Sequence, residues 1–295
     1  MIGLSPEFIA RLDRLRLAVR WVRAGHGLGG RFPLHRRGSS IEFDDYASYT
    51  PGDDIRAIDW PLYARLDRLF VKTYKEEITL SVELVLDATA SMALPTPRKF
   101  ERAAHLALSL GAIALAGGHR VRMTWIAPGE IVGSAWIRHR RDFFREAGIL
   151  LEPLRARGTV SWRDWMRRAA ITRRWRGGQV IFLTDGMVRL PELFGGLQEL
   201  LARHLEIKLL QILSPEELMP SRLIRSGMLV DAETGRTHQL ADQPEVLTRA
   251  MAEHNEAIAR FCTRHGIRFA QHGLDESLDA CLTKTLTAHG FLVTG

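Results

Sequence analysis

Short runs of β-branched and aliphatic residues alternate with longer amphipathic stretches along most of this chain. A short apolar run bounded by turn residues indicates a buried strand, whereas apolar residues spaced three and four apart indicate a helix that covers a sheet. Runs of the first kind occur at 78–86, 120–126, 131–137, 180–184, 206–213 and 268–272. Stretches of the second kind occur at 97–116, 141–154, 162–174, 191–204, 244–265 and 274–288. This alternation predicts an α/β fold with a mostly parallel sheet and helices on both faces.

Three segments do not belong to this alternation. Apolar residues at helical spacing predict an N-terminal helix over 5–23, which a basic, glycine-rich connector follows to residue 40. Residues 69–74 have the β-branched and aromatic character of a strand, which would run into the strand at 78–86. Residues 228–231 and 236–240 predict a small edge β-hairpin. We therefore expect an N-terminal part at 1–76 and an α/β domain at 77–295.

The composition favours a globular protein of a reducing compartment over a membrane or secreted protein. With 295 residues, 46% of them hydrophobic, the chain can bury one large core. The longest apolar stretch, 103–118, is too short to cross a bilayer, and the N-terminus has no apolar segment of the signal-peptide type. The two cysteines, Cys262 and Cys281, fit a reducing compartment. We expect a cytoplasmic protein with no membrane span.

The net charge of +7 comes largely from arginine, much of it between Arg11 and Arg37. Basic arms of this kind bind nucleic-acid phosphates without sequence preference. The arginines of residues 11–16, however, alternate with leucines, which indicates a helix packed on the body with a solvated basic face. An acidic protein partner explains the charge equally well, so nucleic-acid binding is the less favoured interpretation.

Short polar side chains follow two of the predicted strands. Asp87, Thr89 and Ser91 come directly after the apolar run 82–86, Asp185 follows the run 179–183, and Thr159 lies in a loop between them. Because the carboxyl ends of parallel strands open onto the crevice where α/β sheets bind ligands, we expect the residues after both strands at one edge. Carboxylates and hydroxyls suit a hard divalent cation such as Mg²⁺ or Mn²⁺. Taken alone, Ser91 also fits a cap of the helix predicted from residue 97.

The five residues together resemble the metal-ion-dependent adhesion site (MIDAS) of von Willebrand factor A (VWA) domains, whose pattern is D-x-S-x-S, then Thr, then Asp. The resemblance implies that Thr89 and Ser91 bind the metal directly and that Thr159 binds it directly or through water. It implies that Asp87 and Asp185 mostly hold the waters of the metal. Thr89 departs from the serine of the pattern but keeps the hydroxyl. The resemblance also implies a VWA-like, Rossmann-like fold.

A block at 41–77 resembles the signature of the bacterial and archaeal domain-of-unknown-function 58 (DUF58) family. Its central part reads Y-x-x-G-D-D-x-R-x-I-D-W, at Tyr49, Gly52, Asp53, Asp54, Arg56, Ile58, Asp59 and Trp60. Ser40 and Ser48 depart from the family, which commonly has Gly and Arg there. Taken from its residues alone, the block is a solvated connector of mixed charge. Whether the segment Asp53–Trp60 serves packing, the metal site or a separate partner stays open.

The two resemblances imply a role in protein binding. DUF58 proteins are often encoded beside MoxR-type AAA+ ATPases, and VWA proteins commonly act as their adaptors. We therefore predict a metal-dependent adaptor that presents its metal to an Asp or Glu of such an ATPase or of its client, in assembly, remodelling or stress response. Alternatives are a metal-dependent hydrolase that uses Asp87 and Asp185, and a structural interaction protein with a vestigial metal site. The sequence shows no general base or nucleophile beside the five residues, so an enzyme is less favoured.

Overall fold

The computed structural model describes residues 4–19, 41–50, 55, 58–76, 79–96, 98–152, 154–175, 177–219, 227–230, 237–240 and 244–294. The chain divides into two compact units. The α/β unit comprises residues 1–32 and 80–295, and the signature unit comprises residues 33–79. The N-terminal segment thus groups with the α/β unit, whereas the sequence suggested one N-terminal part at 1–76. The reason is that the N-terminal apolar residues Phe8, Leu12, Leu15 and Leu17 join the α/β core.

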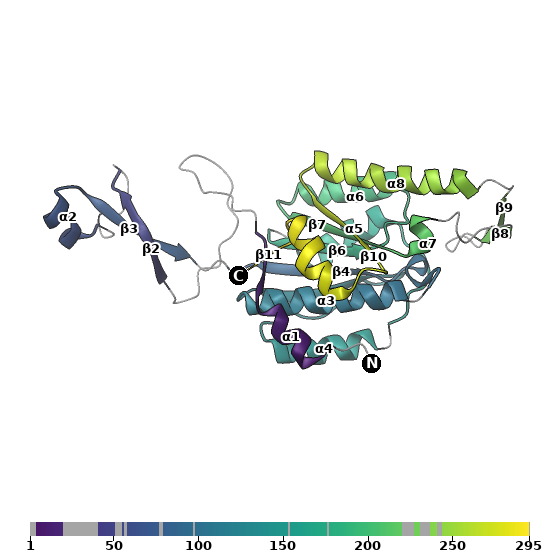
Figure 1. The fold of residues 1–295 in the computed structure, drawn as a ribbon, viewed down its shortest axis with the longest axis horizontal. Coiled ribbons are helices and arrows are strands. Elements are labelled where there is room, and N and C mark those ends of the chain that lie inside the picture. The colour runs from purple at the N-terminus through teal and green to yellow at the C-terminus, as the bar shows by residue number, and fades with distance from the viewer. Residues whose placement is uncertain are drawn as a thin grey trace. The chain divides into compact units, whose positions relative to one another are not determined.

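Five parallel strands form the central sheet of the α/β unit (Figure 1). Their order across the sheet is β10-β7-β6-β4-β5. The strands are β4 (Ser81–Asp87), β5 (Arg120–Ile126), β6 (Gln179–Thr184), β7 (Glu206–Leu213) and β10 (Arg268–Gly273). Four of them coincide with predicted runs to within a residue or two, and the fifth, β4, begins three residues later than predicted. The predicted fold class, an α/β fold with a mostly parallel sheet and helices on both faces, is confirmed.

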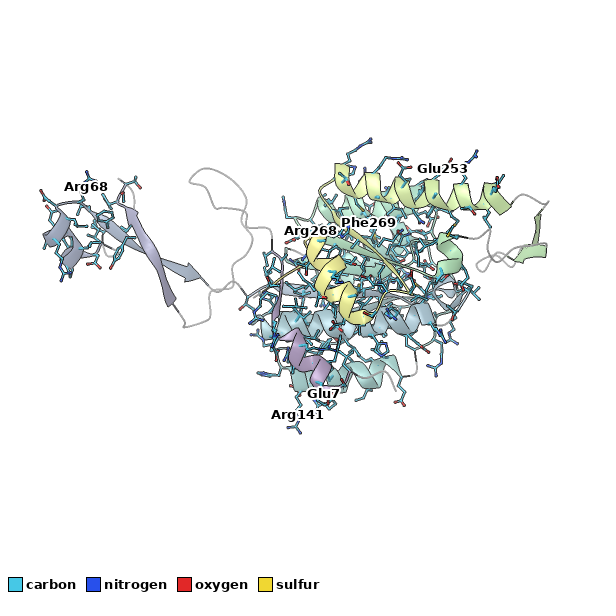
Figure 2. All side chains as sticks on the ribbon, in the orientation of Figure 1. Glu7, Arg68, Arg141, Glu253, Arg268 and Phe269 are labelled. Carbon is cyan, nitrogen blue, oxygen red and sulfur yellow. The ribbon has the colours of Figure 1, made fainter. Side chains whose placement is uncertain are left out.

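Helices cover both faces of this sheet (Figure 1). One face packs against α1 (Pro6–Leu12), α3 (Arg98–Ala116) and α4 (Arg140–Leu151), and the other against α5 (Trp162–Thr172), α6 (Leu190–Leu201) and α8 (Pro244–Arg264). Successive residues of a strand point to opposite faces, so Leu84 and Leu86 join the first core and Val85 joins the second. Polar side chains such as Arg141 on α4 and Glu253 on α8 point away from the sheet (Figure 2).

The N-terminal segment differs from the single helix predicted over 5–23. Helix α1 begins after the cap Ser5, whose hydroxyl accepts from the amide of Phe8, and it ends at Leu12. The chain then forms β1 (Leu15–Leu17), which pairs antiparallel with β11 (Leu292–Thr294), a strand that the sequence did not predict. Leu15 and Leu17 are both buried, so their spacing of two is that of a strand. The basic connector and the rest of the predicted helix lie outside the described residues.

Two other expectations need adjustment, and a third is confirmed. The helix predicted over 274–288 is broken into α9 (Leu278–Ala280), a π-helical turn (Cys281–Thr285) and α10 (Leu286–Ala288). The strand predicted over 131–137 contributes isolated antiparallel bridges from Gly133 and Ile137 to β5. The hairpin β8 (Gly227–Val230) and β9 (Thr237–Leu240) is confirmed, as a two-stranded sheet of its own. A one-turn 3₁₀ helix, η2 (Ala90–Ala93), follows β4, and a short helix, α7 (Pro215–Leu218), follows β7.

The signature unit is built on a two-stranded antiparallel sheet. Strand β2 (Ile41–Ser48) pairs with β3 (Phe70–Glu76), and helix α2 (Trp60–Leu66) lies between them in sequence. The strand predicted at 69–74 therefore pairs inside this unit. Asp59 is buried and caps α2 by accepting from the amide of Leu62, and it also accepts from the hydroxyl of Tyr46. This part of the signature serves local structure, whereas Asp53, Asp54 and Arg56 lie outside the described residues.

In the described part of the chain, no helix is both long enough and apolar enough to cross a membrane.

Candidate functional site

The strand order places a crevice at the carboxyl ends of β4 and β6. From β4 the chain passes to β5 on one side, and the next strand, β6, lies on the other side of β4. Open α/β sheets bind their ligands where the order reverses in this way, because the connections diverge there and leave the strand ends open. Asp87 is the last residue of β4, and Asp185 directly follows β6. The two predicted carboxylates therefore lie at the reversal point of the sheet.

Asp87 organises the loop that follows β4. Its Oδ1 accepts from the backbone amide of Thr89 at 2.9 Å and from the hydroxyl of Thr89 at 2.7 Å. The hydroxyl oxygens of Thr89 and Ser91 are 3.2 Å apart. The 3₁₀ turn η2 thus brings the side chains at alternate positions of D-x-T-x-S to one point, while their neighbour Met92 enters the core.

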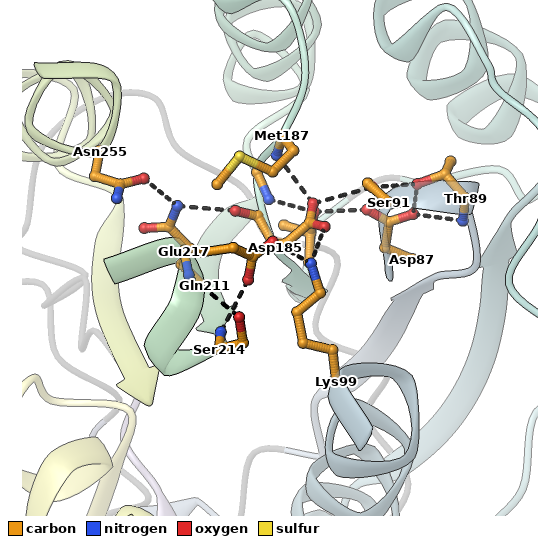
Figure 3. Close-up of polar contacts among 12 residues, drawn as sticks. Asp87, Thr89, Ser91, Lys99, Asp185, Met187, Gln211, Ser214, Glu217 and Asn255 are labelled. Carbon is orange, nitrogen blue, oxygen red and sulfur yellow. Dashed lines mark hydrogen bonds and ion pairs between the residues drawn. The ribbon is translucent and has the colours of Figure 1, made fainter. Parts of the chain in front are cut away.

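Asp185 closes the cluster from the β6 side (Figure 3). Its Oδ1 accepts from the hydroxyl of Ser91 at 3.3 Å and from the backbone amide of Met187 at 2.9 Å. Thr184 joins the strands directly, because its hydroxyl donates to Oδ2 of Asp87 at 2.6 Å. Asp87 and Asp185 are each only 1% exposed. Four of the five predicted residues therefore belong to one buried, hydrogen-bonded cluster.

The fifth residue, Thr159, lies on an adjacent loop and is exposed. Two backbone hydrogen bonds hold this loop against the Asp87 loop, from the amide of Ala90 to Gly158 and from the amide of Arg157 to Ala88, both 2.9 Å. Thr159 lines a cavity of about 480 Å³ together with residues of the α5 N-terminus and of the loop after β5. The structure thus places Thr159 on the loop beside the buried cluster, and among the described residues no hydrogen bond joins its side chain to the cluster.

Two residues that the sequence analysis did not identify complete the cluster. Lys99, at the start of α3, is fully buried, and its Nζ lies 2.7 Å from Oδ2 of Asp185 and 2.5 Å from Oε1 of Glu217 (Figure 3). Glu217 belongs to α7, far from Lys99 in sequence. The sequence did contain a signal for Lys99. It stands directly before the apolar residue Phe100, in a helix whose other buried residues are mostly alanine and leucine. No sequence pattern pointed to Glu217, because its partner is 118 residues away.

Burial and mutual repulsion dominate the electrostatics of this cluster. Burial raises the pKa of Asp87 to about 7, and the nearby Asp185 carboxylate adds to the rise. Burial also raises the pKa of Glu217. Burial alone would lower the pKa of Lys99, but the attraction of Asp185 and Glu217 outweighs it and the pKa of Lys99 is raised. An additional cation at this place would therefore be stabilised by two carboxylates that disfavour each other.

The donor set fits a hard divalent cation. When ionised, the three carboxylates Asp87, Asp185 and Glu217 and the one ammonium, Lys99, leave two negative charges among the described residues of the cluster. A Mg²⁺ or Mn²⁺ ion carries the two positive charges that would balance them. Hydroxyl and carboxylate oxygens are also the ligands that such ions prefer. Thr89 and Ser91 lie where their oxygens can converge on one ion, with Thr159 on the neighbouring loop.

A second group of ligand-type side chains, His272, Glu276 and Cys281, lies close together in the described part of the chain, with its ligand atoms within 4.8 Å of one another. Arg102 donates to Nε2 of His272 at 2.9 Å, so the ring proton is on Nδ1, which faces Oε2 of Glu276 at 2.8 Å. Nδ1 then has no lone pair to offer, and burial raises the pKa of the Cys281 thiol to about 12. This group is a satisfied internal network.

Comparison with known proteins shows which family shares this arrangement. The sequence profile of the family described as "Protein of unknown function DUF58" matches residues 45–132, which include the signature unit from β2 onward, β4 and the Asp87 loop. This stretch of the chain is therefore similar to the DUF58 family. The chain is also similar to two uncharacterized mycobacterial proteins, Rv1480 of Mycobacterium tuberculosis and Mb1516 of Mycobacterium bovis. Each is 26% identical over 268 residues, which are 87% of this chain and 81% of the relative.

Solved structures similar to this chain include bacterial proteins and a VWA domain. BatB from Bacteroides thetaiotaomicron has a TM-score of 0.37 at 15% identity, over 68% of this chain and 93% of BatB. An aerotolerance-related membrane protein from Bacteroides fragilis has a TM-score of 0.38 at 14% identity, over 71% of this chain and 99% of that protein. The SpRpn10 VWA domain has a TM-score of 0.35 at 14% identity, over 46% of this chain and 76% of that domain.

Proposed function

We propose that this protein is a protein-binding module whose sheet edge binds Mg²⁺ or Mn²⁺. Thr89 and Ser91 would hold the ion through their hydroxyls, Thr159 would do so directly or through water, and Asp87 and Asp185 would orient the waters of the ion. The observation that supports this proposal is the buried cluster itself. Four predicted residues from two strand ends are joined by hydrogen bonds, and the cluster has two negative charges in excess when ionised.

The bound ion would supply a positive charge to which a carboxylate from outside can bind. Because the hydroxyl ligands are neutral and the carboxylates of the cluster lie behind them, the outer side of the ion stays positive and would attract an Asp or Glu of a partner. Thr159 is exposed and lies beside the cluster, and so marks the side from which a partner would approach. We propose a MoxR-type AAA+ ATPase, or its client, as the partner and an adaptor as the role, in the cytoplasm.

Calorimetric titration of the metal-stripped protein with Mg²⁺ and Mn²⁺ tests the metal site. We expect saturable binding that Asp87→Asn and Ser91→Ala each weaken by at least about tenfold, because each removes a group that holds the ion or its water. Asp164→Asn is the matched control, since Asp164 is an exposed carboxylate on α5 that pairs with Arg167 at the surface. Binding that is equally weakened by the control, or absent from the unaltered protein, would refute the metal site.

Partner binding needs a separate experiment. The protein is immobilised with Mg²⁺ or with a chelator, and the MoxR-type ATPase is added in each condition. We expect binding in Mg²⁺ that the chelator and Ser91→Ala remove, with circular dichroism unchanged. Partner binding that survives both treatments would favour the interaction protein with a vestigial metal site. Hydrolysis of an ester or phosphoester that requires the metal and Asp87 would favour the hydrolase.

A further inference from the structure

Lys99 is an ammonium group enclosed in the protein interior. It is the second residue of α3 and is 0% exposed. Its Nζ contacts Oδ2 of Asp185 on one side and Oε1 of Glu217 on the other. Burying an ammonium group is costly unless carboxylates surround it, so the fold retains this charge only together with both partners. One of the partners, Asp185, is at the same time a member of the candidate metal site.

Glu217 is held on both of its carboxylate oxygens. Oε1 faces Lys99, and Oε2 accepts from the backbone amide of Ser214 at 2.8 Å, while the hydroxyl of Ser214 accepts from the amide of Glu217 at 3.3 Å. This capping box begins α7 directly after β7. Lys99 therefore connects three elements at the carboxyl edge of the sheet, namely α3, the end of β6 and α7.

The arrangement shows what the lysine does to the site. Asp185 has one oxygen directed at Ser91 and the backbone of Met187, and the other oxygen directed at Lys99. The ammonium group thus neutralises part of the charge that Asp185 would otherwise offer to a metal. Two opposite charges in contact in the protein interior interact more strongly than at the surface, because the interior screens them less than water does.

We infer that Lys99 sets the charge of this site, so that the site binds a divalent cation with reduced affinity and leaves the cation electropositive toward a partner carboxylate. This inference rests on the proposed function and adds a regulator of the same site. Lys99 is a positioning residue, because it would act on the cation through Asp185. Glu217 opposes it, because the Glu217 carboxylate draws part of the ammonium charge away from Asp185.

Three variants change the charge of the cluster in different directions. With all groups ionised, the unaltered cluster carries −2, from three carboxylates and one ammonium. Lys99→Met removes the positive charge and makes the cluster more negative, Glu217→Gln makes it less negative, and the double variant restores the original charge. If charge decides affinity, Lys99→Met binds Mn²⁺ at least about tenfold more tightly, Glu217→Gln at least about tenfold more weakly, and the double variant about as tightly as the unaltered protein.

The measurement is calorimetric titration of all four proteins with Mn²⁺ at one pH of about 8, which lies above the pKa of about 7 of Asp87. It is accompanied by thermal unfolding of each protein in EDTA and in excess Mn²⁺. We expect Lys99→Met to have the lowest Tm in EDTA and the largest rise in Tm on addition of Mn²⁺, because the ion then supplies the missing positive charge. If Lys99→Met does not fold without metal, Glu217→Gln and the double variant provide the comparison.

The possible outcomes separate the inference from the proposed function. The predicted order of affinities supports both. If the unaltered protein binds Mn²⁺ but the variants do not follow the order, for example if all three merely weaken binding, the inference is overturned and the proposed metal site stands. If only Lys99→Met binds Mn²⁺, the unaltered protein has no metal site, and both the proposed function and the inference are overturned, with Lys99 as the resident cation. If neither the unaltered protein nor any variant binds Mn²⁺, both are overturned.

Discussion

Asp185 shows how a single carboxylate can belong to the binding edge and to the internal structure at once. One oxygen accepts hydrogen bonds from the hydroxyl of Ser91 and the amide of Met187, and the other accepts one from the buried ammonium of Lys99. In Asp185→Asn the amide group would retain one acceptor and would place either a donor or a neutral oxygen against Lys99. The ammonium would then be compensated by Glu217 alone.

We therefore expect Asp185→Asn to destabilise the protein even in the absence of metal. The loss should be about 3–5 kcal/mol, as for a buried pair broken on one side. Urea unfolding in EDTA measures it, with Asp164→Asn as the surface control, for which we expect less than about 1 kcal/mol. Equal stability losses in the two variants would contradict the internal role of Asp185.

Lys208 is a second buried lysine, but its ammonium group contacts neutral backbone carbonyls, whereas that of Lys99 contacts two carboxylates. Its Nζ donates to the backbone carbonyls of Ala18 and Phe291, at 2.6 and 3.1 Å. Burial lowers the pKa of Lys208 from 10.5 to about 7. Between these two values the unfolded chain binds the proton more tightly than the folded protein does. Stability should therefore rise as the pH rises from about 7 toward 10.5.

Replacing Lys208 by methionine should remove this dependence. We expect the free energy of unfolding of the unaltered protein to increase by a few kcal/mol (~2–4) between about pH 7 and 10, and that of Lys208→Met to change less. The carbonyls of Ala18 and Phe291 keep other donors, namely Gln179 and the amide of Ala18, so the variant leaves neither unpaired. Urea unfolding across this range tests the prediction, with the exposed Lys284→Met as control. Parallel curves for all three proteins would contradict it.

At the residue scale, what the sequence could predict was limited by sequence distance. Asp87, Thr89 and Ser91 are neighbours, and Asp185 follows a run of the same kind, so strand periodicity was enough to place them together. Lys99 and Glu217 come from helices whose placement the pattern does not determine, and an isolated lysine near a helix start is usually solvated. The direct or water-mediated role of Thr159 stays a prediction.

At the scale of elements, α3 and α4 pack closely where one of them lacks a side chain. A Cβ at Gly111 of α3 would overlap the buried ring of Phe143 on α4. A Cβ at Gly148 of α4, by contrast, would meet no other atom within 4 Å. Alanine is favoured over glycine inside a helix by about 1 kcal/mol, so the two glycines should respond to the same substitution with opposite signs.

We expect Gly111→Ala to destabilise the protein by about 1–3 kcal/mol, because Phe143 must leave its position and the overpacking exceeds the gain in helix propensity. Gly148→Ala should stabilise it by up to about 1 kcal/mol. Thermal or urea unfolding of both variants measures the difference. A stabilised Gly111→Ala would show that α4 can move away from α3 without loss.

The hydrophobic periodicity of the sequence was enough to predict the long helices and strands, but not the short ones. All five strands of the central sheet were predicted, because each has six to eight residues in a context of helices and because β4, β5, β6 and β7 are buried along almost their whole length. Strands β1 and β11 have three residues each and exist through their pairing with each other. The π-helical turn at Cys281–Thr285 interrupts a stretch whose apolar spacing was that of a continuous helix. Tertiary contacts determine such elements, and these contacts cannot be predicted from the pattern of a single sequence.

At the scale of the whole molecule, the signature unit is inserted into the α/β unit. The chain leaves the α/β unit after residue 32 and returns to it at residue 80. Replacement of residues 33–79 by a flexible Gly/Ser linker of about 15 residues should therefore leave the α/β unit folded. We expect one cooperative unfolding transition and retained Mn²⁺ binding, measured by calorimetry. Loss of cooperative unfolding would show that the α/β unit depends on the signature unit.

The pairing of β1 with β11 has a consequence for the order in which the protein can be completed on the ribosome. Strand β1, the first strand of the described residues, has its partner far along the chain, at Leu292–Thr294. The carbonyl of Ala18 likewise has no donor from Gln179 or Lys208 until those residues have been translated. Until then Leu15 and Leu17 form an unpaired apolar edge, of the kind that cells shield with chaperones. A nascent chain that stalls before Leu292 would thus leave Leu15 and Leu17 exposed, and the chain can bury them only after Thr294 has been synthesised.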